Sequence, residues 1–417
     1  MKYGLIGEKL SHSFSKEIHE ALADYTYEIR ELTPDEVAPF LKAREFDGIN
    51  VTIPYKEKVI PYLDEISDAA KKIGAVNTVK KVDGRLIGDN TDFYGMREMI
   101  LRAGIAIEGK KVLILGTGGT SKTAKAVLAD LGAKEIVTVS RKASENTLTY
   151  EDAIKLHSDS DIIVNTTPVG MYPNTDACPI DLWNFPNLTG VIDAIYNPLR
   201  TNLILEAKKC GIPATGGLMM LILQAARASE IFLGKEIDGE SVAKVVKTIF
   251  ESKENIVLIG MPGSGKSTIG KLLAGITGRA FTDTDTAIEK MTGKHPSEII
   301  REKGEDAFRD IETQAVREVS KKSGIVIATG GGIVKRSENI PLLRQNGRIF
   351  YLNCPTDELP VTPDRPLSAN RAAIEKLFLA RNLLYTLAAD ATVNISHKNA
   401  PEVSAAEILK IFSEIIL

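Results

Sequence analysis

The residues with the most specific chemistry are Gly260 to Ser267, whose sequence GMPGSGKS fits the pattern GxxxxGK[ST]. The apolar run NIVLIG leads into them, and residues with the apolar spacing of a helix follow. In such a loop, backbone N–H groups bind phosphates, Lys266 would reach the β and γ oxygens, and the Ser267 hydroxyl would bind Mg²⁺. The pattern predicts a nucleotide site, but it does not choose among kinases, GTPases and ATPases.

A second glycine loop, GTGGTSKTA at 116–124, follows the apolar run KVLILG. Glycines at this place permit a tight turn and let backbone N–H groups approach a dinucleotide pyrophosphate. A glycine turn that only packs a helix on a sheet is the structural alternative. The next predicted strand, 136–139, ends in Ser140, Arg141 and Lys142, where an NAD enzyme would place an acidic residue. Two cations suit a 2′-phosphate and favour NADP, although a solvated basic turn is also possible.

Lys56 and Asp92 could act together in proton transfer. Lys56 follows NVTIPY, and Asp92 lies in GDNTDFYG, a segment typical of a polar turn. Alone, each residue would more often lie on the surface. In one cleft the carboxylate would orient the ammonium, and the two would form a proton-transfer pair. Ser15 is expected to be the N-cap of a helix over 16–22, a role compatible with ligand binding.

The two glycine loops each open a predicted strand–helix unit, over 111–131 and 256–276. Apolar residues recur at helical spacing in both units, at Ala124, Val127, Leu128 and Leu131, and at Ile269, Leu272, Leu273 and Ile276. The second opening marks a new domain, with the boundary near 247–254. Before residue 110, strands are expected at 3–6 and 48–53, with helices after Ser15 and Pro34.

The composition excludes several classes of protein. With 417 residues, 43% of them hydrophobic, and a formal net charge of −3, the chain is typical of a soluble protein of several domains. The charge favours no nucleic acid or anionic membrane as partner. The three cysteines have no metal or disulfide spacing, and the N-terminal apolar run is too short for a signal peptide, so we expect a cytoplasmic protein. A monomer is compatible with the sequence, which does not determine the oligomeric state.

The N-terminal part resembles the shikimate dehydrogenase family. The matching motifs run in the family's order over residues 1 to about 245: SHSFS at 11–15, NVTIPYK at 50–56, GAVNT at 74–78, GDNTD at 88–92, the loop at 116–124, NTTPVGM at 165–171, IYNPLRTNLI at 195–204 and GGLMMLILQA at 216–225. The resemblance implies reduction of 3-dehydroshikimate by NADPH, with Lys56 and Asp92 managing the proton. It also implies that the substrate is bound by Ser13, Ser15, Asn77, Asp92 and Gln224, with Thr52 and Tyr196 nearby.

The same resemblance implies an NADP site formed by Gly116, Gly118, Gly119, Thr120, Ser140, Arg141, Lys142 and Gly217. Two departures concern this site. Ser140 and Lys142 differ from the family's usual basic or Asn-Arg-Thr turn, which leaves Arg141 as the safest assignment. Lys122 stands where an arginine is often found.

The C-terminal part, over nearly all of 255–417, resembles shikimate kinase through FTDTD at 281–285, AFRDIE at 307–312, IATGGG at 327–332, DRPL at 364–367 and ARNLLY at 380–385. The resemblance places Asp283 near Mg²⁺ with Ser267, and Asp285 on the hydroxyl to be phosphorylated. It implies that shikimate is bound by Asp285, Arg309, Gly330, Gly331, Gly332 and Arg381, and ATP by Gly263, Ser264, Gly265, Lys266, Ser267, Thr268 and Arg365. By spacing alone, Arg309 would form a helix-surface ion pair with Glu312 or Asp310.

The segment before Arg365, which the resemblance makes a lid, is shorter than usual and holds no earlier arginine after Leu352. The expected fold is α/β: a substrate domain (1–98 and 216–250), a Rossmann NADP-binding domain (99–215) and a P-loop kinase domain with a parallel sheet (255–417). The product of the first implied reaction is the substrate of the second. The alternative is an active dehydrogenase fused to a degenerate kinase-like binding module.

Overall fold

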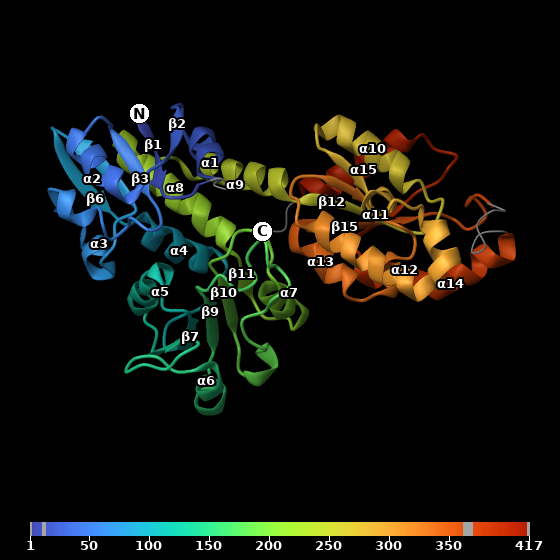
Figure 1. Cartoon of the computed structure of the whole chain (residues 1–417), viewed down its shortest axis with the longest axis horizontal. Helices are drawn as coiled ribbons and strands as arrows, with labels where there is room; N and C mark the ends of the chain where they lie inside the picture. Colours follow the sequence, from blue (N-terminus) through green and yellow to red (C-terminus); the bar gives the residue numbers. More distant parts are fainter. Residues whose placement is uncertain (1, 11–13, 362–369, 415–417) are drawn as a thin grey trace. The chain divides into compact units, whose positions relative to one another are not determined.

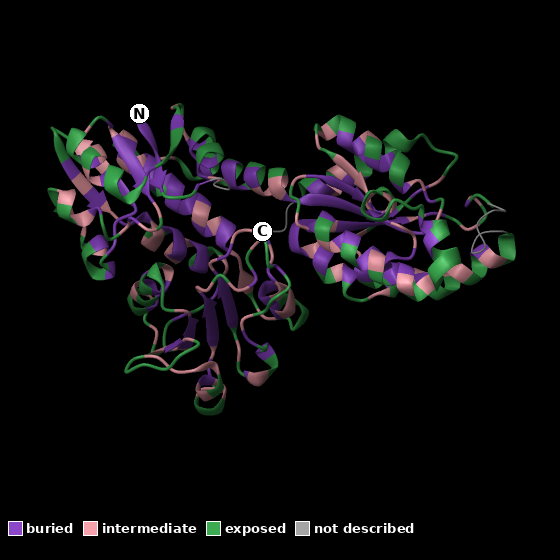
Figure 2. Ribbon diagram, in the orientation of Figure 1, coloured by how far each residue is buried: buried purple, intermediate pink, exposed green. Residues whose placement is uncertain are grey.

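The computed structural model describes residues 2–10, 14–361 and 370–414. It divides into two compact units, one formed by 1–197 and 201–249 and the other by 198–200 and 250–417. Three sheets, each carrying its own buried strands, account for the α/β architecture (Figures 1 and 2). The expected α/β fold class is confirmed, whereas the domain limits remain predictions.

The first sheet has six strands in the order β2-β1-β3-β5-β6-β4. Strands β1, β2 and β3 are mutually parallel, whereas β5 runs antiparallel to both β3 and β6. The strands are β1 (Tyr3–Gly7), β2 (Tyr27–Glu31), β3 (Gly48–Val51), β4 (Glu65–Ile66), β5 (Thr78–Val82) and β6 (Arg85–Asp89). The helices around them are α1 (Ser15–Leu22), α2 (Pro34–Ala43), the 3₁₀ turn η1 (Ile60–Tyr62), α3 (Asp68–Ile73), α4 (Thr91–Arg102), α8 (Gly217–Leu233) and α9 (Gly239–Lys253).

Helix α2 shows how local sequence sets these boundaries. Thr33 and Glu36 form a capping box, in which the Thr33 N–H donates to Glu36 Oε2 at 2.8 Å, and Pro34 occupies the first helical turn.

Helix α8 lies against the first sheet although it is distant from it in sequence. Its Ala228 and Phe232 share a buried cluster with Tyr3, Leu5 and Tyr27. Its packing on α4 depends on Gly95, since a Cβ there would lie 2.6 Å from the Met220 carbonyl oxygen. This close approach brings residues of α8 and α4 into one site.

The second sheet contains five parallel strands in the order β11-β10-β9-β7-β8. Its elements are β7 (Lys111–Leu115), α5 (Gly119–Asp130), β8 (Glu135–Val139), α6 (Tyr150–Leu156), β9 (Ile162–Asn165), the 3₁₀ turn η2 (Leu182–Asn184), β10 (Gly190–Asp193), α7 (Asn202–Lys209) and β11 (Ala214–Thr215). The central strands are continuous apolar runs because helices cover both faces of a parallel sheet.

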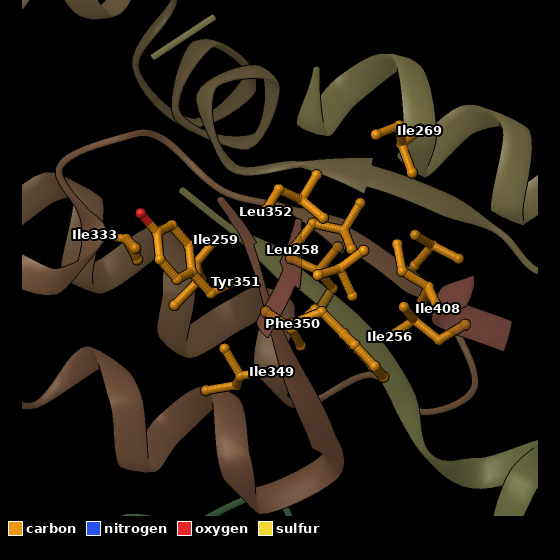
Figure 3. Packing of buried hydrophobic residues seen from close by; sticks show 14 of the residues in the cluster. Ile256, Leu258, Ile259, Ile269, Ile333, Ile349, Phe350, Tyr351, Leu352 and Ile408 are labelled. Carbon is orange, nitrogen blue, oxygen red and sulfur yellow. The ribbon is translucent and has the colours of Figure 1, made fainter. Parts of the chain in front are cut away.

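The second unit is built on five parallel strands in the order β13-β14-β12-β15-β16. Its elements are β12 (Asn255–Ile259), α10 (Lys266–Thr277), β13 (Phe281–Asp283), α11 (Thr284–Thr292), α12 (Pro296–Ser320), β14 (Val326–Ala328), the 3₁₀ turn η3 (Ile333–Lys335), α13 (Asn339–Asn346), β15 (Gly347–Asn353), α14 (Arg371–Ala388), β16 (Ala391–Asn394) and α15 (Pro401–Ser413). Figure 3 shows buried residues of this core, with Ile408 of α15 near Ile256 of β12, and Tyr351 of β15 near Ile333.

The structure corrects four local predictions. Ser15 is the first residue of α1 and not its N-cap, which is Phe14. Asp92 lies in the first turn of helix α4 and not in a polar turn. The strand expected over 48–53 ends at Val51, two residues before the cis bond between Ile53 and Pro54. Ile276, which shares the helical apolar spacing with Ile269 and Leu273, is 56% exposed, whereas those two residues are buried.

Two further observations concern membrane spans and cysteines. No helix among residues 2–10, 14–361 and 370–414 is long and apolar enough to span a membrane. The three cysteines are all free thiols, Cys178 and Cys210 exposed and Cys354 buried.

Candidate active sites

A pocket of about 470 Å³ in the first unit is lined by residues of the first sheet and by residues beside the second, among them Thr120 of α5 and Tyr196 after β10. At its centre, Lys56 Nζ lies 2.6 Å from Asp92 Oδ2, and both side chains are largely buried. Lys56 follows strand β3, whereas Asp92 lies at the start of α4. The fold therefore places the two expected partners in one cleft, as an ion pair open to a ligand.

Most residues assigned to the first substrate site line this pocket. They are Ser15, Thr52, Lys56, Asn77, Asp92, Tyr196 and Gln224, together with Thr120 and Gly217 from the cofactor set. Ser13 lies outside the described residues. The lining also includes residues that the motifs did not single out, among them Lys9, Asn50, Met220 and Leu221.

A buried polar network holds the amide side chains of the pocket. Asn77 Oδ1 accepts the Thr91 N–H at 2.7 Å, so the amide caps the start of α4. Asn50 Oδ1 accepts the Tyr27 hydroxyl at 2.7 Å, and its Nδ2 donates to the Asn77 carbonyl at 3.2 Å. Gln224 Nε2 donates to the carbonyl of Leu221 within α8 at 2.9 Å. Because these amides are fixed by neighbours, they are preorganised for hydrogen bonding. Asn50 could have been found from its place at the start of NVTIPYK.

Tyr196, which lines the pocket, lies just after β10, and the buried carboxylate of Asp193 at the end of β10 holds the backbone around it. Asp193 Oδ1 accepts the Ile195 N–H at 3.0 Å, and Oδ2 accepts the Thr201 hydroxyl at 2.6 Å. Burial raises the pKa of Asp193 to about 6, although these hydrogen bonds act in the opposite direction and lower it. Burial also raises the pKa of the Tyr196 hydroxyl. Asp193 therefore fixes both ends of the segment that presents Tyr196, a role that the sequence motifs did not reveal.

The glycine loop after β7 has the geometry expected for a phosphate-binding turn. Gly116 has φ 106°, and a Cβ there would lie 2.8 Å from Thr166 Oγ1. Nothing lies within 4 Å of a Cβ built on Gly118 or Gly119, which begin α5. The backbone at this helix N-terminus is therefore accessible to an anion.

The basic turn after β8 lies at the same edge of the second sheet, because β7 and β8 are paired parallel neighbours. The Ser140 hydroxyl donates to the Lys142 carbonyl at 2.5 Å, which shapes the turn, and Arg141 and Lys142 are exposed. Lys122 of α5 forms an ion pair with Glu57 at 2.6 Å.

In the second unit, the loop after β12 wraps around Lys266. Gly260, Gly263 and Gly265 all have positive φ, at 146°, 80° and 79°. Such angles favour glycine and turn successive N–H groups toward one side of the loop. The buried Lys266 Nζ donates to the carbonyls of Gly260 at 3.0 Å and Met261 at 2.8 Å. Ser264 and Thr268 belong to the same loop and the first turn of α10.

Two side chains with oxygen atoms that could bind a metal ion lie together beside this loop. The Ser267 hydroxyl donates to Asp283 Oδ2 at 2.6 Å, and Asp283 Oδ1 accepts the Asp285 N–H at 3.0 Å. Mg²⁺ prefers oxygen ligands and usually takes only one or two from the protein, with phosphate and water completing the shell. The donor set thus fits Mg²⁺. Asp283 ends β13 and Asp285 lies in the first turn of α11, so both come from one strand–helix junction.

Arg309 is buried, and not on the helix surface. It is 5% exposed and forms ion pairs with Glu312 and Glu305, each at 2.8 Å. Asp310 instead pairs with Arg336. Lys335 and Arg309 lower the pKa of Glu305 to about 2, whereas burial raises the pKa of Glu312 despite Arg309. The spacing correctly predicted Glu312 as a partner of Arg309, but the ion pair is buried and not on the helix surface.

Two glycines, Gly330 and Gly332, make room for these side chains, and Gly331 between them accepts hydrogen bonds. A Cβ at Gly330 would lie 3.0 Å from both Asp285 Oδ1 and Glu312 Oε1, and one at Gly332 would lie 2.2 Å from the Arg309 guanidinium. The Gly331 carbonyl accepts hydrogen bonds from Arg381 Nη1, at 2.7 Å, and from the Tyr385 hydroxyl.

These glycine contacts bring Asp285, Arg309 and Arg381 around Gly330 to Gly332. Glu312 and Tyr385 are members of the cluster that sequence reasoning did not assign to it. Arg365 lies outside the described residues.

Both the N-terminal and the C-terminal part of the chain match known protein families. A model of the shikimate dehydrogenase substrate binding domain matches residues 5–79, and a shikimate kinase model matches residues 262–413. A shikimate dehydrogenase (NADP(+)) of Clostridium beijerinckii is 39% identical over 60% of this chain and 98% of its own length.

Solved structures agree. A chorismate mutase/shikimate 5-dehydrogenase fusion protein from Clostridium acetobutylicum matches with TM-score 0.57 and 35% identity, covering 60% of this chain and 97% of that one. Shikimate 5-dehydrogenase from Thermus thermophilus, in complex with NADP(H) and shikimate, matches with TM-score 0.54 and 29% identity over 60% and 99%. The chain therefore belongs to the shikimate dehydrogenase family and carries, fused at its C-terminal end, a shikimate kinase domain.

Proposed function

We propose that this chain catalyses two consecutive reactions, the NADPH-dependent reduction of 3-dehydroshikimate to shikimate and the ATP-dependent phosphorylation of shikimate to shikimate 3-phosphate. The observation that carries the first activity is the Lys56–Asp92 pair, 2.6 Å apart in a pocket lined by amides and hydroxyls. The second rests on the juxtaposition of Asp283 and Asp285 with the loop that holds Lys266.

In the first pocket, Lys56 would donate a proton to the substrate oxygen as negative charge develops there. Asp92 keeps the Lys56 ammonium in place for this transfer. Asn77, Gln224 and Ser15 would bind the substrate hydroxyls and carboxylate, with Thr52 and Tyr196 beside them. NADPH, when bound, supplies the hydride that reduces the ketone carbon.

The cofactor would lie along the C-terminal edge of the second sheet. Gly116, Gly118 and Gly119 would approach its pyrophosphate, and Thr120 and Gly217, which line the substrate pocket, would also help to hold it. Arg141, with Ser140 and Lys142, would bind the 2′-phosphate. A guanidinium suits this group because it offers paired N–H donors.

In the second unit, Asp285 would orient and deprotonate the shikimate hydroxyl, while Arg309 and Arg381 bind the carboxylate. Lys266 and the loop N–H groups would hold the phosphates, and Ser267 and Asp283 would hold Mg²⁺. ATP with Mg²⁺ supplies the phosphoryl group. Such a transfer needs alignment and charge neutralisation more than covalent help, which matches this constellation.

The alternative, a kinase-like domain that binds without turnover, is motivated by the short segment before Arg365. Against it, Lys266, Asp283, Asp285, Arg309 and Arg381 are all present. The free thiols support a cytoplasmic location for both activities.

Separate assays on the full chain test each half. With 3-dehydroshikimate, the loss of NADPH absorbance measures reduction. With shikimate, ATP and Mg²⁺, formation of ADP measures phosphorylation. Turnover in both assays supports the proposal, whereas absence of ADP with saturating shikimate would favour the alternative.

A further inference from the structure

The charges that line the first pocket do not cancel. Its lining contains three charged residues among those described, Lys9, Lys56 and Asp92. Lys56 and Asp92 neutralise each other as an ion pair at 2.6 Å. Lys9 therefore leaves the pocket with one net positive charge.

Lys9 is held at the pocket by its neighbours. It follows strand β1, and the next residue, Leu10, is 8% exposed and packs with Tyr3 and Leu5. The Leu10 N–H donates to Glu31 Oε1 at 2.7 Å, which fixes the backbone beside Lys9. The Lys9 side chain itself is exposed and has no ion pair or hydrogen bond with any residue that the structure describes.

The rest of the described lining offers a carboxylate only neutral partners. Asn50, Asn77 and Gln224 are neutral amides, and Leu5, Leu10 and Met220 are apolar. Amides and hydroxyls bind the hydroxyls of a neutral polyol as well as those of an acid. A fixed positive charge adds to the discrimination between the two, because only the acid can form an ion pair with it.

We infer that Lys9 is a specificity-determining residue of the dehydrogenase, whose ammonium binds the substrate carboxylate and selects the acid over neutral analogues. This inference rests on the proposed function. Lys9 takes no part in the proton transfer, which belongs to Lys56 and Asp92. Its loss should therefore raise KM and leave kcat nearly unchanged, because the ion pair forms equally in the ground state and the transition state.

The test compares shikimate with its methyl ester, which has the same hydroxyls and no charge, as substrates for oxidation by NADP⁺. In the Lys9→Gln variant of the full chain, we expect the ratio of kcat/KM for acid over ester to fall about tenfold, which corresponds to about 1.4 kcal/mol. The kcat/KM for the ester should stay within about twofold of the wild type. Lys9→Arg should restore the preference for the acid. Lys16→Gln, an exposed lysine of α1 that pairs with Glu20, is the matched control.

The outcomes separate this inference from the proposed function. If both substrates lose activity equally in Lys9→Gln, or if the ratio is unchanged, Lys9 does not determine specificity, and the inference is overturned while the dehydrogenase activity stands. A folded wild-type chain that oxidises neither substrate would overturn the proposed function, and this inference with it.

Discussion

The two sites of this chain use charge in opposite ways. The pocket of the first unit has one ion pair and one further lysine among neutral amides and apolar side chains. The site of the second unit is dense with charge, since Arg309 alone pairs with Glu305 and Glu312 beside Asp285 and Arg381. The difference follows the proposed chemistry, because reduction of a ketone needs one proton donor, whereas phosphoryl transfer must neutralise several charges.

The two glycine loops also differ in their backbone conformation. The phosphate loop of the second unit depends on three glycines with positive φ, at 260, 263 and 265, whereas in the loop after β7 only Gly116 has a positive φ. A loop that surrounds phosphates turns several N–H groups inward, while a dinucleotide pyrophosphate is met mainly at a helix N-terminus.

The largest expected effect is at the proton donor of the first pocket. Lys56→Ala should lower the kcat for reduction by about 10²–10⁴-fold, because the alkoxide loses its general acid. Phosphorylation of added shikimate should not change. NADPH loss and ADP formation are measured on the same preparation, with Lys58→Ala, an exposed neighbour, as control. Loss of both activities in the folded variant would contradict two separate sites.

The converse change is Lys266→Ala, which removes the cation that the loop carbonyls surround. We expect the kcat for phosphorylation to fall by about 10²–10³-fold, the size typical of one electrostatic contact to a transition state. Reduction should proceed at the wild-type rate. Lys271→Ala, exposed on the same helix, controls for loss of surface charge. A Lys266→Ala chain that still phosphorylates shikimate would refute the role of the loop.

Stability should depend on pH through Asp193, whose pKa is raised by burial from 3.8 to about 6. Between about pH 4 and 6 the folded state then binds more protons than the unfolded state. The free energy of unfolding therefore falls as the pH rises through this window and stays constant above it. Asp193→Asn should remove up to about 3 kcal/mol of that dependence. Urea unfolding at several pH values measures it, with Asp24→Asn as the exposed control. An unchanged slope in Asp193→Asn would show that this carboxyl does not titrate in the window.

The smallest expected effect concerns the cofactor. Arg141→Gln should raise the KM for NADPH about tenfold, the loss of roughly one charge-assisted hydrogen bond, and leave the KM for NADH unchanged. Lys125→Gln, exposed on α5, serves as the control. Equal changes for NADPH and NADH would mean that Arg141 does not bind the 2′-phosphate.

Patterns of short range predicted much of this molecule. The glycine loops and the apolar runs around them indicated two parallel sheets, because such strands are buried on both faces. The pairing of Lys56 with Asp92 was also expected, although it depends on two elements that are 36 residues apart.

Properties set by tertiary packing could not be read from the sequence. Spacing identified Glu312 as a partner of Arg309, but only the fold shows that the pair is buried against Gly332. Asp193 and Lys9 belong to no pattern of charged residues, and only the fold shows that Asp193 is buried and that Lys9 lines the pocket. Ser15 carries the residue type of an N-cap, yet Phe14 precedes the helix at that place.

The central claim, that one chain performs both reactions in sequence, is tested most directly by a coupled assay on the full chain. It receives 3-dehydroshikimate, NADPH, ATP and Mg²⁺, and both NADPH loss and ADP formation are followed. We predict that ADP forms in a one-to-one ratio with the NADPH consumed, and that no ADP forms when NADPH is omitted unless shikimate is added. Consumption of NADPH with no ADP, even after shikimate is supplied, would contradict the account.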